Sequence, residues 1–286
     1  MEAQKQLITI DVGRVLASRL GAERYRRIPA CVVRWLERFI RQDRLNELLR
    51  NNYPLTGADF CAGVLRDMRV DYRVIHPERL PSAADGPDAQ RVLFVSNHPL
   101  GGLDGICLID LLARRVCPEG VQPAFIVNDL LMAVEPLADV FVPVNKHGRQ
   151  SRSSAAMVDE VFDGPRPVMM FPAGLVSRRR HGQPVRDLAW NPMFVRRAAK
   201  SGRDIIPLHF GGENSNFFYK FANLRERLGM KFNIEMLRLP AELVGAEGRT
   251  FDVTVGKRIP AATLCQELTP LEEAARIRGL IYEPDM

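Results

Sequence analysis

The sequence predicts an α/β fold, with a mixed, mostly parallel sheet flanked by helices and a helical extension at the N-terminus. From about residue 90 onward, short apolar runs alternate with stretches of helical periodicity, which is typical of a sheet covered by helices. The 286 residues are 46% hydrophobic, enough to build the core of one large α/β domain. A polar linker with proline and glycine at 81–87 precedes this alternation. We therefore expect a membrane-associating helical region over 1–80 and an α/β domain over 81–286.

The expected strands are short apolar runs at 92–95, 124–127, 140–144, 167–171, 205–210 and 251–255. Only the last of them alternates apolar and polar residues, as expected of a half-exposed strand. Helical stretches are expected at 58–70, 105–116, 130–137, 152–162, 191–201, 217–228 and 270–282. The polar residues at 211–216 indicate a glycine turn with Ser or Asn capping the helix that follows.

A basic amphipathic helix is expected over residues 28–50. Its arginines Arg34, Arg38, Arg41 and Arg44 recur every three or four residues and so share one face. Much of the formal net charge of +6 lies here, since residues 19–50 hold nine arginines and four acidic residues. With Trp35 on the helix, this pattern suits an anionic membrane surface. An equally good interpretation is a helix packed on the core with a solvated arginine face.

His98 and Asp104 form the most informative pair in the chain. They lie in a glycine-bearing loop between the buried strand at 92–95 and the helix expected at 105–116. Open α/β sheets bind ligands at such strand ends. A histidine beside a carboxylate suits a general base whose tautomer is fixed by its partner. The alternative is ordinary turn chemistry, in which the pair is incidental.

Two further loops place cations after strands. Lys146 and Arg149 follow the strand at 140–144, and a Pro-x-Gly turn leading to Arg178 follows the strand at 167–171. Arginine and lysine hold anions by charge-assisted hydrogen bonds, although a solvated basic loop has the same composition. Because parallel strands end at one edge, we expect these loops to converge with the His98 loop on one site.

Several classes of function have no support in the sequence. There is no Gly-x-Gly-x-x-Gly motif and no P-loop, so no nucleotide cofactor is expected. The five histidines and five cysteines show no metal-ligand spacing, so we expect no metal site. The cysteines are scattered and odd in number, so we expect the protein in a reducing cytoplasm. No secretory signal and no apolar run of about 18 residues is present, so we expect no membrane span. Nucleic-acid binding is disfavoured because the basic excess is local and amphipathic.

Four blocks in order resemble the lysophospholipid acyltransferase superfamily, which includes bacterial 1-acylglycerol-3-phosphate acyltransferases. The matching segments are Asn97-His98 with Asp104, residues 142–146, Phe171-Pro172-Ala173-Gly174 and residues 205–208. The resemblance covers about residues 90–260. Five residues separate His98 from Asp104, where the family usually has four, and glycines in the loop absorb the extra residue. This longer form resembles the branch that O-acylates N-acyl amino acid lipids such as ornithine or glycine lipids.

The resemblance implies an O-acyltransferase that moves a fatty acyl group from an acyl-carrier protein or coenzyme A thioester to a lyso-lipid hydroxyl. His98 would be the general base and Asp104 its orienting partner. The acceptor's anionic head would be bound by substrate-binding residues from the second and third blocks, namely Lys146, Arg149, Phe171, Pro172, Gly174 and Arg178. The expected location is cytoplasmic, peripheral on the inner face of the cytoplasmic membrane. A non-catalytic lipid- or acyl-carrier-binding protein is the alternative.

Overall fold

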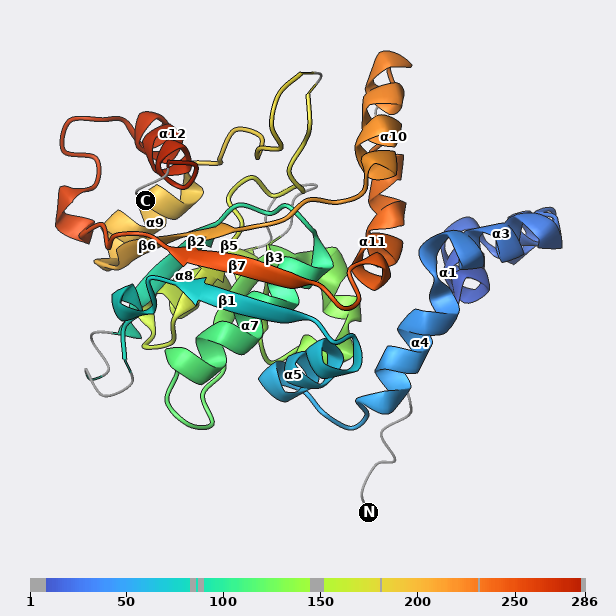
Figure 1. The fold of residues 1–286 in the computed structure, drawn as a ribbon, viewed down its shortest axis with the longest axis horizontal. Coiled ribbons are helices and arrows are strands. Elements are labelled where there is room, and N and C mark those ends of the chain that lie inside the picture. Colours follow the sequence, from blue (N-terminus) through green and yellow to red (C-terminus); the bar gives the residue numbers. More distant parts are fainter. Residues whose placement is uncertain are drawn as a thin grey trace.

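The computed structural model describes residues 9–82, 86, 90–144, 152–180, 182–230 and 232–283. Within them, seven strands form one sheet in the order β1-β7-β6-β2-β5-β3-β4 (Figure 1). Strands β6, β2, β5, β3 and β4 are parallel, β7 is antiparallel to β6, and β1 is parallel to β7. The strands are β1 (Asp71–Ile75), β2 (Val92–Ser96), β3 (Ala124–Asn128), β4 (Phe141–Val144), β5 (Val168–Met170), β6 (Asp204–Phe210) and β7 (Thr250–Val255). This mixed, mostly parallel sheet confirms the predicted fold class.

Helices cover both faces of the sheet (Figure 1). One face packs against α5 (Gly57–Asp67) and α7 (Gly102–Arg115), and the other against α8 (Arg152–Asp163), α9 (Met193–Ser201) and α12 (Pro270–Leu280). Strand β2 contributes to both layers, because Phe94 faces α7 while Leu93 and Val95 face the opposite way. Burial on both faces explains why the central strands are continuous apolar runs.

The parallel strands β6, β2 and β5 are neighbours, so the loops that follow them leave the sheet at one edge. The loop after β2 leads into α7, and the loop after β5 leads toward α9. The loop after β6 leads into α10 (Asn216–Arg227), which is followed by a short 3₁₀ helix, η5 (Ile234–Arg238), and by α11 (Leu239–Gly245). The edge at the carboxyl ends of parallel strands is where open α/β sheets bind ligands.

Four N-terminal helices form an arm beside the sheet (Figure 1). They are α1 (Val12–Leu20), α2 (Ala22–Tyr25), α3 (Ala30–Ile40) and α4 (Gln42–Asn51). Hydrogen bonds join the two ends of the arm. The Asn46 side chain accepts from the Ile10 N–H at 2.7 Å and donates to the Ile10 C=O at 2.8 Å. Leu48 on α4 reaches the main core. No helix in the described part of the chain is long and apolar enough to cross a membrane.

The structure differs from the expected elements in four places. The helix expected over 28–50 is two helices, because Arg41 adopts a left-handed conformation with φ 61°. Residues 130–137 form two short 3₁₀ helices, η3 (Asp129–Ala133) and η4 (Glu135–Leu137), in place of one α-helix. Strand β1 and helix α11 had not been expected. Residues 57–75 thus pack with the sheet through α5 and β1, although they precede residue 80, where we expected the helical region to end.

Candidate active site

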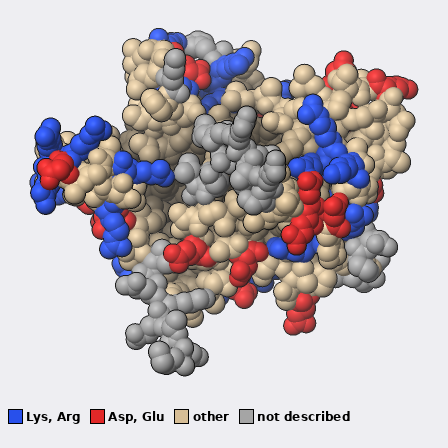
Figure 2. All heavy atoms as spheres, turned by 180° about the vertical axis from the view of Figure 1, so that it is seen from behind, with Lys and Arg blue, Asp and Glu red and all other residues tan. Residues whose placement is uncertain are grey.

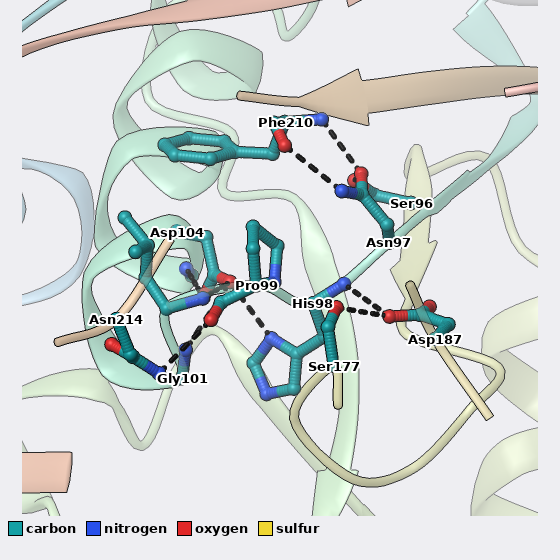
Figure 3. A network of polar contacts seen from close by, with 12 residues as sticks. Ser96, Asn97, His98, Pro99, Gly101, Asp104, Ser177, Asp187, Phe210 and Asn214 are labelled. Atoms are coloured by element: carbon teal, nitrogen blue, oxygen red, sulfur yellow. Dashed lines mark hydrogen bonds and ion pairs between the residues drawn. The ribbon is translucent and has the colours of Figure 1, made fainter. Parts of the chain in front are cut away.

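The loop after β2 is clamped to the neighbouring strand β6 before it reaches His98. The Asn97 side chain accepts a hydrogen bond from the Phe210 N–H at 2.7 Å and donates one to the Phe210 C=O at 2.9 Å (Figure 3). The Asn97 amide is buried, so both bonds are shielded from water. This clamp fixes the point at which His98 emerges from the carboxyl edge of the sheet.

The His98 ring faces a buried carboxylate in the first turn of α7. His98 Nδ1 and Asp104 Oδ2 are 3.1 Å apart, and the Asp104 side chain is 0% exposed (Figure 3). Asp104 also accepts hydrogen bonds from the backbone N–H groups of Leu100 at 2.9 Å, Gly101 at 3.3 Å and Gly105 at 2.8 Å. These donors and the positive end of the helix dipole stabilise the carboxylate charge. The geometry favours the tautomer with its proton on Nδ1, in which Nε2 is the unprotonated nitrogen.

Glycine makes the five-residue spacing between His98 and Asp104 possible. Gly101 has φ 84°, a value that L side chains rarely adopt. A Cβ atom at Gly101 would also lie 3.0 Å from Leu239 Cδ1 on α11. The loop therefore turns tightly into α7 and brings the carboxylate back to the histidine ring.

The loop after β5 holds the His98 backbone on both sides. The His98 N–H donates to Asp187 Oδ1 at 3.1 Å (Figure 3). The His98 C=O accepts from the Ser177 N–H at 2.8 Å. Asp187 also accepts from Ser177 Oγ at 2.5 Å and from Trp190 Nε1 at 2.8 Å. Burial raises the pKa of Asp187, while the hydrogen bonds from Ser177, Trp190 and the His98 backbone oppose that shift. Sequence reasoning missed Asp187, because nothing in its local sequence marks it.

The third block lies directly against His98. The Phe171 ring stacks on the imidazole with ring centroids 4.0 Å apart and planes inclined by 23°. Pro172 is buried, and its C=O accepts from the Asn191 N–H at 3.0 Å. Gly174 closes a turn with φ 62°, in which its N–H donates to the Phe171 C=O at 2.9 Å. The predicted convergence of this loop with the His98 loop is therefore present.

Arg178, which we expected either to hold an anion or to lie in a solvated basic loop, is inside the protein. It is 8% exposed, its Nη2 is 2.7 Å from Glu235 Oε1, and its guanidinium carbon lies 5.8 Å from the Phe218 ring centroid. Burial lowers the pKa of Arg178, and the Glu235 carboxylate opposes that shift. Among the described residues, Arg178 Nη1 has no hydrogen-bond partner. Lys146 and Arg149 lie outside the described residues.

A cleft of about 500 Å³ opens beside the His98 loop, between the start of α10 and α11. It adjoins the loop through Leu100 and Leu103 but is not lined by His98. Its charged walls are largely paired internally, since Arg179 contacts Glu213 and Arg238 lies 3.5 Å from Glu242. The candidate chemistry therefore lies in the His98 network and not in this cleft.

Three comparisons with known proteins bear on this geometry. A family model described as "Acyltransferase" matches residues 14–278. Two proteins named lyso-glycine lipid O-acyltransferase are 37% identical in Phocaeicola vulgatus and 38% identical in Bacteroides thetaiotaomicron, each over 97% of this chain and over 95% and 98% of their own lengths. A crystal structure of PlsC, the 1-acyl-sn-glycerophosphate (LPA) acyltransferase of Thermotoga maritima, is similar with TM-score 0.44 and 14% identity, over 86% of this chain and 92% of that one. The chain is therefore an acyltransferase and belongs to the lysophospholipid acyltransferase superfamily, as the order of its four blocks had indicated.

Proposed function

We propose that the protein transfers a fatty acyl group from the thioester of acyl-carrier protein or coenzyme A to the hydroxyl group of a lyso-lipid. The observation that carries this proposal is the contact of 3.1 Å between His98 Nδ1 and the fully buried Asp104 carboxylate, at the carboxyl edge of the sheet. His98 Nε2 takes the proton of the acceptor hydroxyl as its oxygen attacks the thioester carbonyl. The C–S bond then breaks, and the imidazolium returns the proton to the leaving thiolate.

A backbone N–H in the first turn of α7 is the proposed donor to the oxyanion. Three glycines near His98 could supply this N–H, but Gly101 already donates to Asp104 and Gly174 to Phe171. Gly102 is the first residue of α7, where the helix itself supplies no acceptor, and it is exposed. Its N–H therefore suits the charge that develops on the carbonyl oxygen.

The acceptor that we favour is an N-acyl amino acid lipid with a carboxylate head. This choice rests on the relatives, which are named for a lyso-glycine lipid and share 37–38% identity over 97% of the chain. Lys146, Arg149 and Arg178 are the proposed cations for this head. For Arg178 the supporting observation is its buried Nη1, which lacks a hydrogen-bond partner among the described residues. A guanidinium donor bonds a carboxylate or a phosphate equally well, so the assay has to compare both head groups.

The acceptor proposed here resides in a bilayer, so we also propose that the protein works at the inner face of the cytoplasmic membrane. The exposed arginines Arg34, Arg38 and Arg41 support this placement, because they can contact anionic lipid. Trp35 beside them is 58% exposed, as expected of a helix that lies at a membrane interface.

The test is a product assay with the full-length protein. Acyl-carrier protein or coenzyme A thioesters are incubated with vesicles that contain either lysophosphatidic acid or an N-(3-hydroxyacyl) glycine, and the lipids are identified by mass spectrometry. We expect a diacyl product from the amino acid lipid, and a loss of about 10²- to 10⁴-fold in rate for His98→Ala. Folded His98→Ala with near-normal turnover would overturn the mechanism. Binding of both substrates without any product would favour the non-catalytic alternative.

A further inference from the structure

Helix α10 and the segment after it expose an unusual number of large apolar side chains. Phe217, Phe221 and Leu224 recur at helical spacing, so they lie on one side of α10. The rings of Phe217 and Phe221 stack with centroids 5.9 Å apart, and Phe232 beyond the helix is 85% exposed. We call this surface the α10 face, made of Phe217, Phe221, Leu224, Leu228, Met230 and Phe232.

The opposite side of α10 is anchored in the protein, so the exposed side chains do not result from a loosely placed helix. Phe218 is 0% exposed and packs with Val176 from the loop after β5. The buried Glu235 carboxylate on η5 joins this layer, with Oε1 2.7 Å from Arg178 and Oε2 2.9 Å from Arg225 on α10. A surface helix normally turns polar residues outward, and here both sides of α10 carry apolar residues. Contiguous exposed apolar residues of this kind mark a surface that binds something.

The α10 face continues onto the N-terminal arm through Arg238. The Arg238 guanidinium lies 5.2 Å from the ring centroid of Phe39 on α3 and 5.4 Å from that of Phe217 on α10. It also donates to the Phe39 C=O at 3.1 Å. On α3, the exposed Trp35 ring stacks on Phe39 with centroids 5.0 Å apart. Helices α3 and α10 are distant in sequence but form one apolar surface, and the Arg238 guanidinium lies where they meet.

The charges around this surface are mainly positive. Residues 216–238 hold five cations and two acidic residues, and of these Arg225 and Glu235 are buried against each other. Residues 30–41 hold three arginines and one acid. In Figure 2 the lobe that contains α10, at the upper left, is mostly tan, whereas Lys and Arg side chains gather on the arm below it. Apolar side chains edged by cations are the pattern of a surface that lies in the interface of an anionic bilayer.

The α10 face also adjoins the candidate active site. Asn214, just before the helix, donates from its buried side chain to the Pro99 C=O in the His98 loop at 3.0 Å (Figure 3). Ser215 then caps α10 by accepting from the Phe218 N–H. The start of α10 is therefore bonded to the loop that carries the proposed base.

We propose that the α10 face and the exposed side of α3 together seat the protein on an anionic lipid bilayer, with Leu224, Leu228 and Phe232 inserted among the lipid head groups. This docking proposal rests on the proposed function in one respect, which is that the candidate active site takes its acceptor lipid from the same bilayer. The arm supplies attraction through its arginines, and the α10 face supplies buried apolar area. The bond between Asn214 and Pro99 then brings the His98 loop toward the membrane.

The test replaces the apolar side chains and leaves the charges unchanged. The variant carries Leu224→Gln, Leu228→Gln and Phe232→Ser, and the matched control carries Leu271→Gln and Met157→Gln, which lie on α12 and α8 and are also exposed. Binding is measured by co-sedimentation with vesicles of phosphatidylcholine and phosphatidylglycerol. We expect the partition of the variant onto vesicles to fall at least about 10-fold and that of the control to stay near wild type. The single change Phe232→Ser, at the most exposed position, guards against a folding defect and should show a smaller loss in the same direction.

Three outcomes would overturn this docking surface. The variant could bind vesicles as well as the control does. It could lose binding to acyl-carrier protein while it keeps vesicle binding, which would make the α10 face a protein interface. It could convert a dimer into a monomer in light scattering without a change in vesicle binding, which would assign the face to a second copy. If vesicle binding behaves as expected but no acyl transfer occurs with any acceptor, the docking surface stands and the proposed function fails.

Discussion

Around His98 the charged groups are buried and paired, whereas most of the charged groups on α3 and α10 lie at the surface beside exposed aromatic rings. Asp104 is 0% exposed and receives three backbone N–H bonds besides its contact with the imidazole. Trp35 and Phe232 are 58% and 85% exposed. The two regions meet at the start of α10, where Asn214 bonds to the His98 loop.

The contrast matches the two tasks that we propose for these regions. A proton-transfer site has to hold its atoms within a few tenths of an ångström before substrate arrives, and a buried, fully bonded loop achieves this. A surface that binds a fluid bilayer needs apolar area and charge without fixed partners. Changes in the first region should therefore alter turnover steeply, and changes in the second should alter membrane partition in proportion to charge or apolar area.

The largest effect is expected from Asp104→Asn. An amide at this position cannot offer two acceptor oxygens to the surrounding N–H groups, and it no longer fixes the imidazole tautomer. We expect turnover to fall by roughly 10²- to 10⁴-fold while vesicle binding stays at the wild-type level. Rates are measured by lipid-product mass spectrometry at saturating thioester.

The matched control is Asp110→Asn on the same helix. Its carboxylate is also buried and is bonded to Tyr72 and Arg114, but it does not contact His98. If both variants lost turnover equally, the loss would reflect the stability of α7. The proposed division of tasks between the two regions would then be wrong.

The next largest effect concerns the buried ion pairs of Glu235, which join α10 to the loop after β5. Glu235→Gln leaves Arg178 and Arg225 buried with no carboxylate between them. Breaking such a buried ion pair typically costs about 3–5 kcal/mol, so we expect the free energy of unfolding to drop by that amount in a urea titration. Glu226→Gln is the control, because this acid is 56% exposed and its contact with Arg225 should contribute less than about 1 kcal/mol. If both variants lost the same free energy of unfolding, the Glu235 ion pairs would not stabilise the protein in the way that we propose.

The sequence was sufficient for the His98 loop because its parts are close together in the chain. A buried strand, a glycine turn and a helix start all lie within residues 92–105 and bring His98 and Asp104 into contact. Asp187 acts on His98 from 89 positions away and could not be predicted, since only the path of the loop after β5 brings it there. The burial of Arg178 could not be predicted for the same reason, because it depends on Glu235 on η5. The edge strand β1 was missed because it is short: Tyr72 and Val74 alternate with exposed residues over only five positions, which is a weak strand signal.

The smallest effect concerns the arm and separates charge from apolar contact at the membrane. Changing Arg34, Arg38 and Arg41 together to Gln removes three exposed cations from the arm. Each basic residue near an anionic surface contributes about 1 kcal/mol at most, so vesicle partition should fall by up to roughly 100-fold at low salt and by much less at 0.15 M. The control changes Arg69, Arg73 and Lys200 to Gln, which removes the same net charge from other exposed positions.

Partition is measured across a salt series on vesicles with and without phosphatidylglycerol. We expect wild type and control to share one steep salt dependence, and the arm variant to show a shallow one with residual binding from the α10 face. The residual binding should persist on neutral vesicles, because apolar insertion does not depend on lipid charge. If the arm variant and the control lost binding equally, net charge alone would attract the protein to the bilayer. The arm would then be a helix packed on the core with solvated arginines, and only the α10 face would remain as the membrane-facing region.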